Sequence, residues 1–214
     1  MTTTTTVQFA ATMGPAEEDQ ARADMYSLLA RLLFAPPDAY LYQNLAAAPV
    51  RLGAVQPLEQ AWAALANAAA RIPLQAVRDE YDALFVSIAA PKVNPFASLY
   101  QAGFLHEGPL VELRADLARL GLARRSGSGD TEDHLGALCE TMRVLIAGSG
   151  GRAPQPVEVQ RRFWMAHIAP WYARCLADLR SQPEACFYAF VADLSEAFLA
   201  VEATAFELET EPWM

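Results

Sequence analysis

The sequence predicts an all-α protein, folded as a single-domain helical bundle. Alanine and leucine are abundant, whereas isoleucine and threonine are scarce outside the N-terminal tail, and β-branched residues are those that strands prefer. Apolar residues recur at the three- and four-residue spacing of an amphipathic helix in several segments, and no segment has a strand pattern or repeats another. The length of 214 residues suits one well-buried domain better than two.

In the N-terminal half, proline and acidic residues mark where helices begin and end. Residues 1–16 are expected to form a flexible tail, and residues 17–34 a helix with acidic side chains in its first turn and Pro36-Pro37 behind it. Residues 89–96 contain two prolines and are predicted to be a loop. Further helices are predicted over 38–47, 57–70, 73–85 and 109–120.

Residues 121–130 are rich in glycine, serine and arginine and are predicted to be a flexible linker inside a domain that covers residues 17–210. Asp130 is predicted to cap a helix that runs to Ile146, with Asp133 as a capping-box-like partner. The buried stripe of that helix is expected to consist of Leu135, Leu138, Met142 and Leu145.

The last third of the chain is predicted to hold a long helical stretch and a final helix. Residues 148–156 are predicted to be a loop, and residues 157–179 to be helical with a break at Pro170. Ser181 and Glu184 are predicted to form a capping box for the final helix. The expected core side chains of that helix have strict a/d spacing and are Phe187, Val191, Leu194, Phe198, Val201, Ala205 and Leu208.

The charge and the cysteines restrict the partners and the compartment. With 16 basic and 25 acidic residues the formal charge is −9, which makes nucleic acid and anionic membranes poor partners and would steer a basic peptide toward the protein. Three scattered cysteines without a CxxC motif suit a reducing compartment. The N-terminus lacks the features of a secretory signal, and no apolar run approaches membrane-spanning length, so a cytoplasmic protein without stable membrane insertion is predicted.

The sequence contains no pattern typical of catalysis or cofactor binding. Its histidines, His106, His134 and His167, lie on different segments without an HExxH motif or a cysteine partner. It has no Glu-x-x-His pair of the kind used by di-iron bundles, and no nucleophile elbow, phosphate loop or dinucleotide fingerprint. We therefore expect neither a metal nor a cofactor, and a binding protein rather than an enzyme.

Four short motifs occur in an order typical of one protein family. They are Tyr81-Asp-Ala-Leu84-Phe85, Asn94-Pro95-Phe96-Ala97-Ser98-Leu99-Tyr100, Glu132-Asp133-His134-Leu135 and His167-Ile168-Ala169-Pro170-Trp171. No motif is specific alone, but the ordered set, spread over residues 25–206, resembles the TorD/DmsD/NarJ group of redox-enzyme maturation chaperones. Within that group the chain is most similar to the TorD-like proteins that accompany formate-dehydrogenase-type molybdoenzymes.

The resemblance implies an all-helical cytoplasmic chaperone of the TorD-like type. Such a protein would bind the twin-arginine signal peptide and the apo-form of a molybdenum-containing oxidoreductase subunit until the cofactor is inserted, and so hold back premature export. Many members have a proline before the Asp-His pair where this chain has Glu132, so the surrounding turn is expected to differ. The peptide-binding motifs of the family correspond here to Tyr81, Leu84, Phe85, Asp133 and His134.

The chemistry of a twin-arginine peptide, two arginines followed by an apolar stretch, fits these residues. Glu132 and Asp133 could bind the guanidinium groups through charge-assisted hydrogen bonds. An apolar groove for the following stretch could be lined by Tyr81, Leu84, Phe85 and Tyr100. The residues interpreted as a structural motif, which breaks and packs helices, are Pro95, His167, Pro170 and Trp171.

The same residues have structural interpretations that stay open at this point. Leu84 and Phe85 also fit core packing, Asp133 also fits stabilisation of a helix start, and His134 also fits a hydrogen-bonded structural histidine. The main alternative function is a helical interaction or assembly module without signal-peptide binding, and the third is a small helical enzyme. An exposed last helix would allow a monomer or a domain-swapped dimer.

Overall fold

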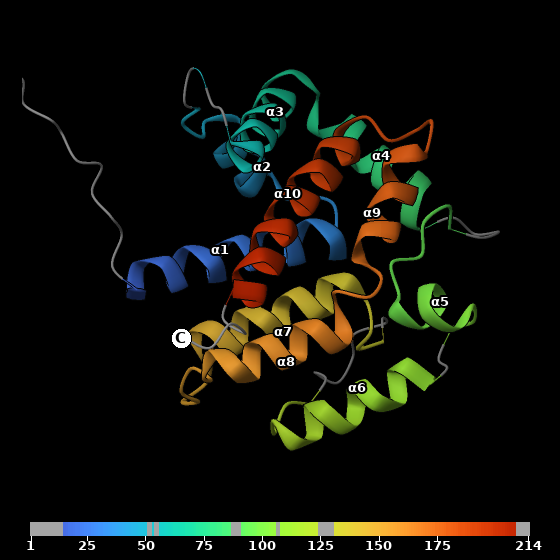
Figure 1. The fold of residues 1–214 in the computed structure, drawn as a ribbon. Helices are drawn as coiled ribbons and strands as arrows, with labels where there is room; N and C mark the ends of the chain where they lie inside the picture. Colours follow the sequence, from blue (N-terminus) through green and yellow to red (C-terminus); the bar gives the residue numbers. More distant parts are fainter. Residues whose placement is uncertain are drawn as a thin grey trace, which may run out of the picture.

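The fold is all-α, as predicted. The computed structural model describes residues 15–50, 53, 56–86, 91–105, 108–123 and 131–208, and within them the chain forms ten α-helices and no strand (Figure 1). Two isolated antiparallel bridges, Phe96–His134 and Ser149–Arg152, are the only strand-like pairings in these ranges. The predicted tail, linker and C-terminal boundary lie almost wholly outside the described residues, so the domain limits stay predictions.

The helices follow the predicted order, with α5 as an addition. Their ends agree with the prediction to within a few residues, except at the start of α7, which begins later than predicted. The helices are α1 (Pro15–Phe34), α2 (Ala39–Ala46), α3 (Pro57–Arg71), α4 (Leu74–Phe85), α5 (Ala97–Ala102), α6 (Gly108–Arg119), α7 (Leu135–Ala147), α8 (Val157–His167), α9 (Tyr172–Ser181) and α10 (Phe187–Leu208).

The last helix, α10, is central to the bundle. It packs against α1, α3, α4 and α9, while α1 packs along α7 (Figure 1). The break predicted at Pro170 is confirmed, because α8 ends at His167 and α9 begins at Tyr172. No helix in the described part of the chain is long and apolar enough to span a membrane. The largest fully buried side chains are Trp164, Trp171, Tyr26, Tyr188 and Phe187.

The N-terminus of α10 is capped by a residue from another helix. Glu80 of α4 is only 9% exposed, and its carboxylate accepts hydrogen bonds from the backbone N–H groups of Cys186, Phe187 and Tyr188 at 2.7–2.9 Å. A negative charge at a helix N-terminus also interacts favourably with the helix dipole. Glu80 therefore satisfies three N–H groups that the helix itself leaves without partners.

The capping box predicted for this helix from Ser181 and Glu184 is consequently wrong. Ser181 is the last residue of α9, and its hydroxyl donates to the backbone carbonyl of Asp178. Glu184 forms an ion pair with Lys92. A carboxylate distant in sequence has taken the capping role, which the local pattern could not indicate.

The predicted a/d pattern of α10 is correct only in its first half, where Phe187, Val191, Leu194 and Phe198 are buried. In the second half Glu202 and Phe206 face the interior instead. A straight α-helix drifts by about 20° per heptad relative to a strict 3.5-residue repeat, so the buried face moves away from the predicted positions. The predicted core positions that are exposed are Val201, Ala205 and Leu208.

The start of α7 also differs from the prediction. His134 is the N-cap, and the helix begins at Leu135, whereas Asp130 lies outside the described residues. Asp133 is not a capping-box partner within α7, because its carboxylate binds α5. The predicted buried stripe of α7 is confirmed and consists of Leu135, Leu138, Met142 and Leu145.

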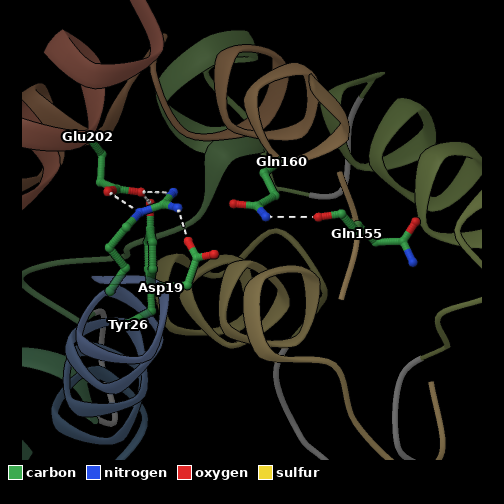
Figure 2. Close-up of polar contacts among 6 residues, drawn as sticks. Asp19, Tyr26, Gln155, Gln160 and Glu202 are labelled. Carbon is green, nitrogen blue, oxygen red and sulfur yellow. Dashed lines mark hydrogen bonds and ion pairs between the residues drawn. The ribbon is translucent and has the colours of Figure 1, made fainter. Parts of the chain in front are cut away.

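Figure 2 shows polar contacts that join α1 to α10 and α8 to the loop before it. Glu202 of α10 accepts hydrogen bonds from Arg22 and Tyr26 of α1. Burial lowers the pKa of the Arg22 guanidinium, but the hydrogen bond and charge of Glu202 outweigh it and raise that pKa overall. The buried Gln160 side chain of α8 donates from Nε2 to the Gln155 carbonyl at 2.9 Å.

Candidate functional site

Asp133 is a buried link between α5 and the start of α7. Its side chain is fully buried, and Oδ2 accepts hydrogen bonds from the backbone N–H of Ser98 at 3.0 Å and from the Ser98 hydroxyl at 2.6 Å. The Thr131 hydroxyl donates to Oδ1, and the Asp133 carbonyl accepts from the Ala97 N–H at 3.0 Å. Asp133 thus caps a short helix 35 residues earlier in the sequence.

His134 fixes the close approach of α1 to α7. Its Nδ1 accepts the backbone N–H of Gly136 at 3.0 Å, and its ring stacks on Phe34 with centroids 5.0 Å apart and planes at 12°. A Cβ atom on Gly136 would lie 3.2 Å from the Phe34 ring and 3.3 Å from the Ala30 carbonyl oxygen. Glycine at this position therefore lets the two helices meet, with the buried imidazole between Phe34 and the turn.

Tyr81, Leu84 and Phe85 form a packing contact between α4, α1 and α10. Leu84 is fully buried, and the Tyr81 hydroxyl donates to the Leu33 carbonyl at 3.4 Å. The rings of Tyr81 and Phe85 both lie against Tyr188, at centroid distances of 5.7 and 5.4 Å. Because Phe34 follows Leu33, the last turn of α1 touches both this motif and His134.

Tyr100 packs against the turn between α8 and α9. Its ring stacks on Trp171 with centroids 5.5 Å apart, and the Arg174 guanidinium lies over the Tyr100 ring and donates to its carbonyl oxygen at 2.9 Å. Burial is the main cause that raises the pKa of Tyr100 above its ordinary value. Tyr100 therefore packs against the α8–α9 turn and lies apart from the other residues that were predicted to line the peptide groove.

The four residues of the predicted structural motif occupy the same region. The Pro95 carbonyl accepts the Leu135 N–H at 2.8 Å, next to the Asp133 link. The buried His167 ring is hydrogen-bonded through Nε2 to Asp116 at 2.7 Å, and the Trp171 indole N–H donates to the His167 carbonyl at 2.7 Å. Pro170 is exposed in the turn. These contacts fit the structural interpretation of the motif.

A groove of about 640 Å³ lies between the end of α6, one face of α7 and the turn that follows α7. Volumes of roughly 300–1,000 Å³ are typical of ligand sites. Its polar lining includes Glu132, Glu140, Thr141 and Arg152. Its apolar lining includes Phe34, Leu117, Leu122, Ala137 and Val144.

The groove extends past Phe34 toward the α1–α2 corner. A second hollow of about 420 Å³ shares Phe34 and Glu140 with the first. Its other walls are mainly apolar and include Ala30, Ala35, Pro36, Pro37 and Leu41. Phe34 is 37% exposed at the end of α1, although its ring stacks on the buried His134.

Each carboxylate of the groove is paired with an arginine of this chain. Arg114 of α6 donates from Nε and Nη2 to Oε2 of Glu132, at 3.1 and 2.9 Å. Arg143 donates to both carboxylate oxygens of Glu140, at 2.8 and 2.7 Å. At the α6 end of the groove, Arg152 donates hydrogen bonds to the backbone carbonyls of Leu120 and Gly121, which directly follow α6.

The structure thus divides the predicted peptide-binding residues among different environments. Of the three consecutive residues Glu132, Asp133 and His134, only Glu132 lines the groove, and it is the position that departs from the family pattern. The side chains of Asp133 and His134 are buried. Phe34 and Glu140 line the groove too, although neither was among the predicted peptide-binding residues. An aromatic residue two positions before the Pro36-Pro37 stop was the available signal for Phe34. Within the described residues no group of three or more potential ligands could hold a metal ion.

Comparisons with known proteins point to one family. Residues 53–177 match the model of the nitrate reductase delta subunit family. The chain is 24% identical over 212 residues to the perchlorate reductase assembly chaperone protein of Dechloromonas aromatica (strain RCB), covering 91% of this chain and 94% of that protein. A solved structure from Archaeoglobus fulgidus, assigned as a redox enzyme maturation protein, aligns with a TM-score of 0.55 at 14% identity, covering 91% of this chain and 98% of that one.

Proposed function

Because the chain belongs to the nitrate reductase delta subunit family, we propose that it binds the twin-arginine signal peptide of a molybdenum-containing oxidoreductase subunit in the groove at Phe34, Glu132 and Glu140. Family membership confirms the predicted TorD/DmsD/NarJ group and makes the chain a redox-enzyme assembly chaperone rather than a catalyst. The cytoplasmic location, the apo-subunit as second partner and the link to formate-dehydrogenase-type enzymes are part of the proposal.

The observation that carries the proposal is the pairing of two carboxylates with an apolar groove. Glu132 and Glu140 both line the groove, and Phe34 is exposed where it meets the second hollow. A carboxylate can bind a guanidinium through two charge-assisted hydrogen bonds. An apolar stretch that follows two arginines would find contact surface beyond Phe34, along the prolines of the α1–α2 corner.

Asp133 and His134 act in this proposal as positioning residues. Asp133 holds the turn that carries Glu132, through hydrogen bonds to Ser98 and Thr131. His134 stacks on Phe34 and so fixes the aromatic wall of the groove. Neither side chain needs to leave the interior to influence binding. The same holds for Tyr81, whose hydroxyl contacts Leu33 beside Phe34.

The net charge of the chain supports the same partner. A protein with a formal charge of −9 attracts a basic peptide over several ångströms and speeds its encounter with the groove. This long-range attraction is sequence-independent, so discrimination between arginine and lysine must come from the carboxylate geometry at Glu132, because Arg143 already binds both oxygens of Glu140.

Isothermal titration calorimetry with twin-arginine signal peptides from molybdoenzymes of the same organism tests the proposal. We expect binding that weakens when Lys-Lys replaces Arg-Arg, because an ammonium group lacks the planar fork with which a guanidinium forms two parallel hydrogen bonds to a carboxylate. Phe34→Ala should weaken binding by about tenfold, as expected for an aromatic anchor. The control is Tyr40→Ala, since Tyr40 is 73% exposed on α2 and does not line the groove.

Two results would contradict the proposal. One is the absence of heat with every such peptide; the other is an equal loss of affinity in Phe34→Ala and Tyr40→Ala. Binding of an apo-subunit that lacks its signal peptide, together with no binding of the peptide alone, would favour the alternative of an assembly module without signal-peptide recognition.

A further inference from the structure

We propose that Arg114 competes with the peptide for the Glu132 carboxylate. The Arg114 guanidinium binds this carboxylate in the unliganded protein, and an arginine of the incoming peptide displaces it. The inference rests on the proposed function and adds how the groove is regulated. In the unliganded protein the carboxylate already holds a guanidinium, supplied by a different helix. The ligand group therefore replaces a like group rather than entering an empty position.

The geometry of the Arg114–Glu132 pair is that of an exchangeable contact. Both donors of Arg114 converge on the single oxygen Oε2, at 3.1 and 2.9 Å. The side chain of Arg114 is 52% exposed and that of Glu132 is 16% exposed, so the pair lies at the rim of the groove. Solvent can reach the arginine, and a departing guanidinium would be hydrated at once.

The buried ion pair between Arg22 and Glu202 differs from the Arg114–Glu132 pair in both geometry and burial. Arg22 and Glu202 use both carboxylate oxygens at 2.8 Å each, and the Glu202 side chain is only 2% exposed. A two-oxygen arrangement is stronger and more directional than two donors on one oxygen. The Arg114–Glu132 pair is the more exposed and the less directional of the two pairs, so it is the easier one for a peptide guanidinium to exchange.

Competition by Arg114 should lower the affinity of the protein for the twin-arginine peptide by a measurable factor. Half-exposed ion pairs contribute little to stability, and losing one corresponds to a change of about two- to fivefold in an equilibrium constant. We therefore expect Arg114→Ala to bind the twin-arginine peptide about two- to fivefold more tightly than the unmodified chain. Glu132→Gln should weaken binding, and Arg114→Ala should add nothing in the Glu132→Gln background.

A charge-matched control separates this effect from general electrostatics. Arg119→Ala removes the same charge from the same helix, but Arg119 pairs with Asp116 within α6 and does not line the groove. Any gain from a more negative surface appears equally in both variants, so the excess gain of Arg114→Ala reports displacement. Thermal unfolding of each variant verifies that the bundle is intact.

The outcomes distinguish this inference from the function on which it rests. Equal affinities of Arg114→Ala and Arg119→Ala, or weaker binding by Arg114→Ala, would overturn the competitor role while leaving peptide binding in place. A gain that persists in the Glu132→Gln background would overturn it too, because Arg114 would then act elsewhere. No binding by the unmodified chain or by any variant would overturn the proposed function, and this inference with it.

Discussion

The guanidinium of Arg22 and the carboxylate of Glu202 form two parallel hydrogen bonds of 2.8 Å inside the bundle, between residues 180 positions apart in the sequence. The Tyr26 hydroxyl donates to the same carboxylate at 3.1 Å, and Asp19 accepts from the outer face of the guanidinium at 3.0 Å (Figure 2). This network joins the first long helix to the last. It therefore closes the bundle between the two ends of the described chain.

We expect Glu202→Ala to lower the free energy of unfolding by about 3 kcal/mol, because the largely buried Arg22 guanidinium keeps only the half-exposed Asp19 as a charged partner and the Tyr26 hydroxyl loses its acceptor. Urea denaturation followed by circular dichroism measures the change. Glu207→Ala, at an exposed position on the same helix, should stay within about 0.5 kcal/mol. A loss below about 1 kcal/mol for Glu202→Ala would mean that the pair is solvated rather than buried.

Long amphipathic helices were predictable from the sequence because their signals are local. Proline stops and three-and-four spacing placed α1, α3, α4 and α6, and the break at Pro170 separated α8 from α9. α5 was not predictable in this way. It has six residues, and its start depends on the carboxylate of Asp133, which is far away in the sequence.

The groove was less predictable than the fold. Motif recognition selected Glu132, but a motif does not reveal which of three consecutive side chains faces outward. That depends on the non-helical turn before α7, which orients Asp133 inward and Glu132 toward Arg114. Glu140 stands on the outer face of a helix, and only the arrangement of α6, α7 and α1 makes that face the wall of a groove.

The cap on α10 provides a second stability prediction. Glu80→Ala would leave the backbone N–H groups of Cys186, Phe187 and Tyr188 without their acceptor. Loss of a helix cap costs about 1 kcal/mol, and a buried unsatisfied donor costs about 1–3 kcal/mol. We therefore expect a loss of about 2–4 kcal/mol in the free energy of unfolding, measured by urea denaturation.

The neighbouring Asp79 supplies the control for this experiment. Asp79 is exposed, and its carboxylate accepts a hydrogen bond only from Gln75 on the same helix among the contacts described. Asp79→Ala removes the same charge and should change the stability by less than about 0.5 kcal/mol. Similar losses in both variants would show that charge, and not capping, determines the effect.

Asp133 and Glu132 are adjacent, yet we expect neutralisation of Asp133 to lower the stability of the fold and neutralisation of Glu132 to lower the affinity for the peptide. In Asp133→Asn the amide oxygen can still accept both Ser98 donors, but the N–H₂ group then faces the Thr131 hydroxyl, which donates to Oδ1 in the unmodified chain, and every remaining hydrogen bond loses its charge assistance. We expect a cost of about 2 kcal/mol of stability. Glu132→Gln, at the rim, should change the stability by less than about 0.5 kcal/mol and should lower peptide affinity.

Paired measurements on the same preparations check this contrast. Urea denaturation should separate the two variants, and calorimetry with the twin-arginine peptide should show the loss in Glu132→Gln at a temperature where both are folded. Equal stability losses would contradict the burial of Asp133. A folded Asp133→Asn that binds no peptide while Glu132→Gln binds normally would contradict the role assigned to the Glu132 carboxylate.

The three cysteines should differ sharply in reactivity. Cys139 and Cys175 are buried and Cys186 is exposed. Burial raises the pKa of the Cys175 thiol to about 12, despite an opposing hydrogen bond from the Tyr100 hydroxyl. A thiol is nucleophilic only as the thiolate, so at pH 8 hardly any Cys175 side chain would be reactive even if reagent could reach it.

We therefore expect Ellman's reagent to modify one thiol rapidly in the folded protein and all three in urea. Raising the pH from 7 to 9 should leave the folded-state count at one, because this window lies well below a pKa of about 12 for Cys175. Cys186→Ser should remove the rapid phase. A second rapid thiol in the folded chain would mean that the helices around Cys139 or Cys175 open readily, since neither reagent nor hydroxide reaches those positions while the bundle is closed.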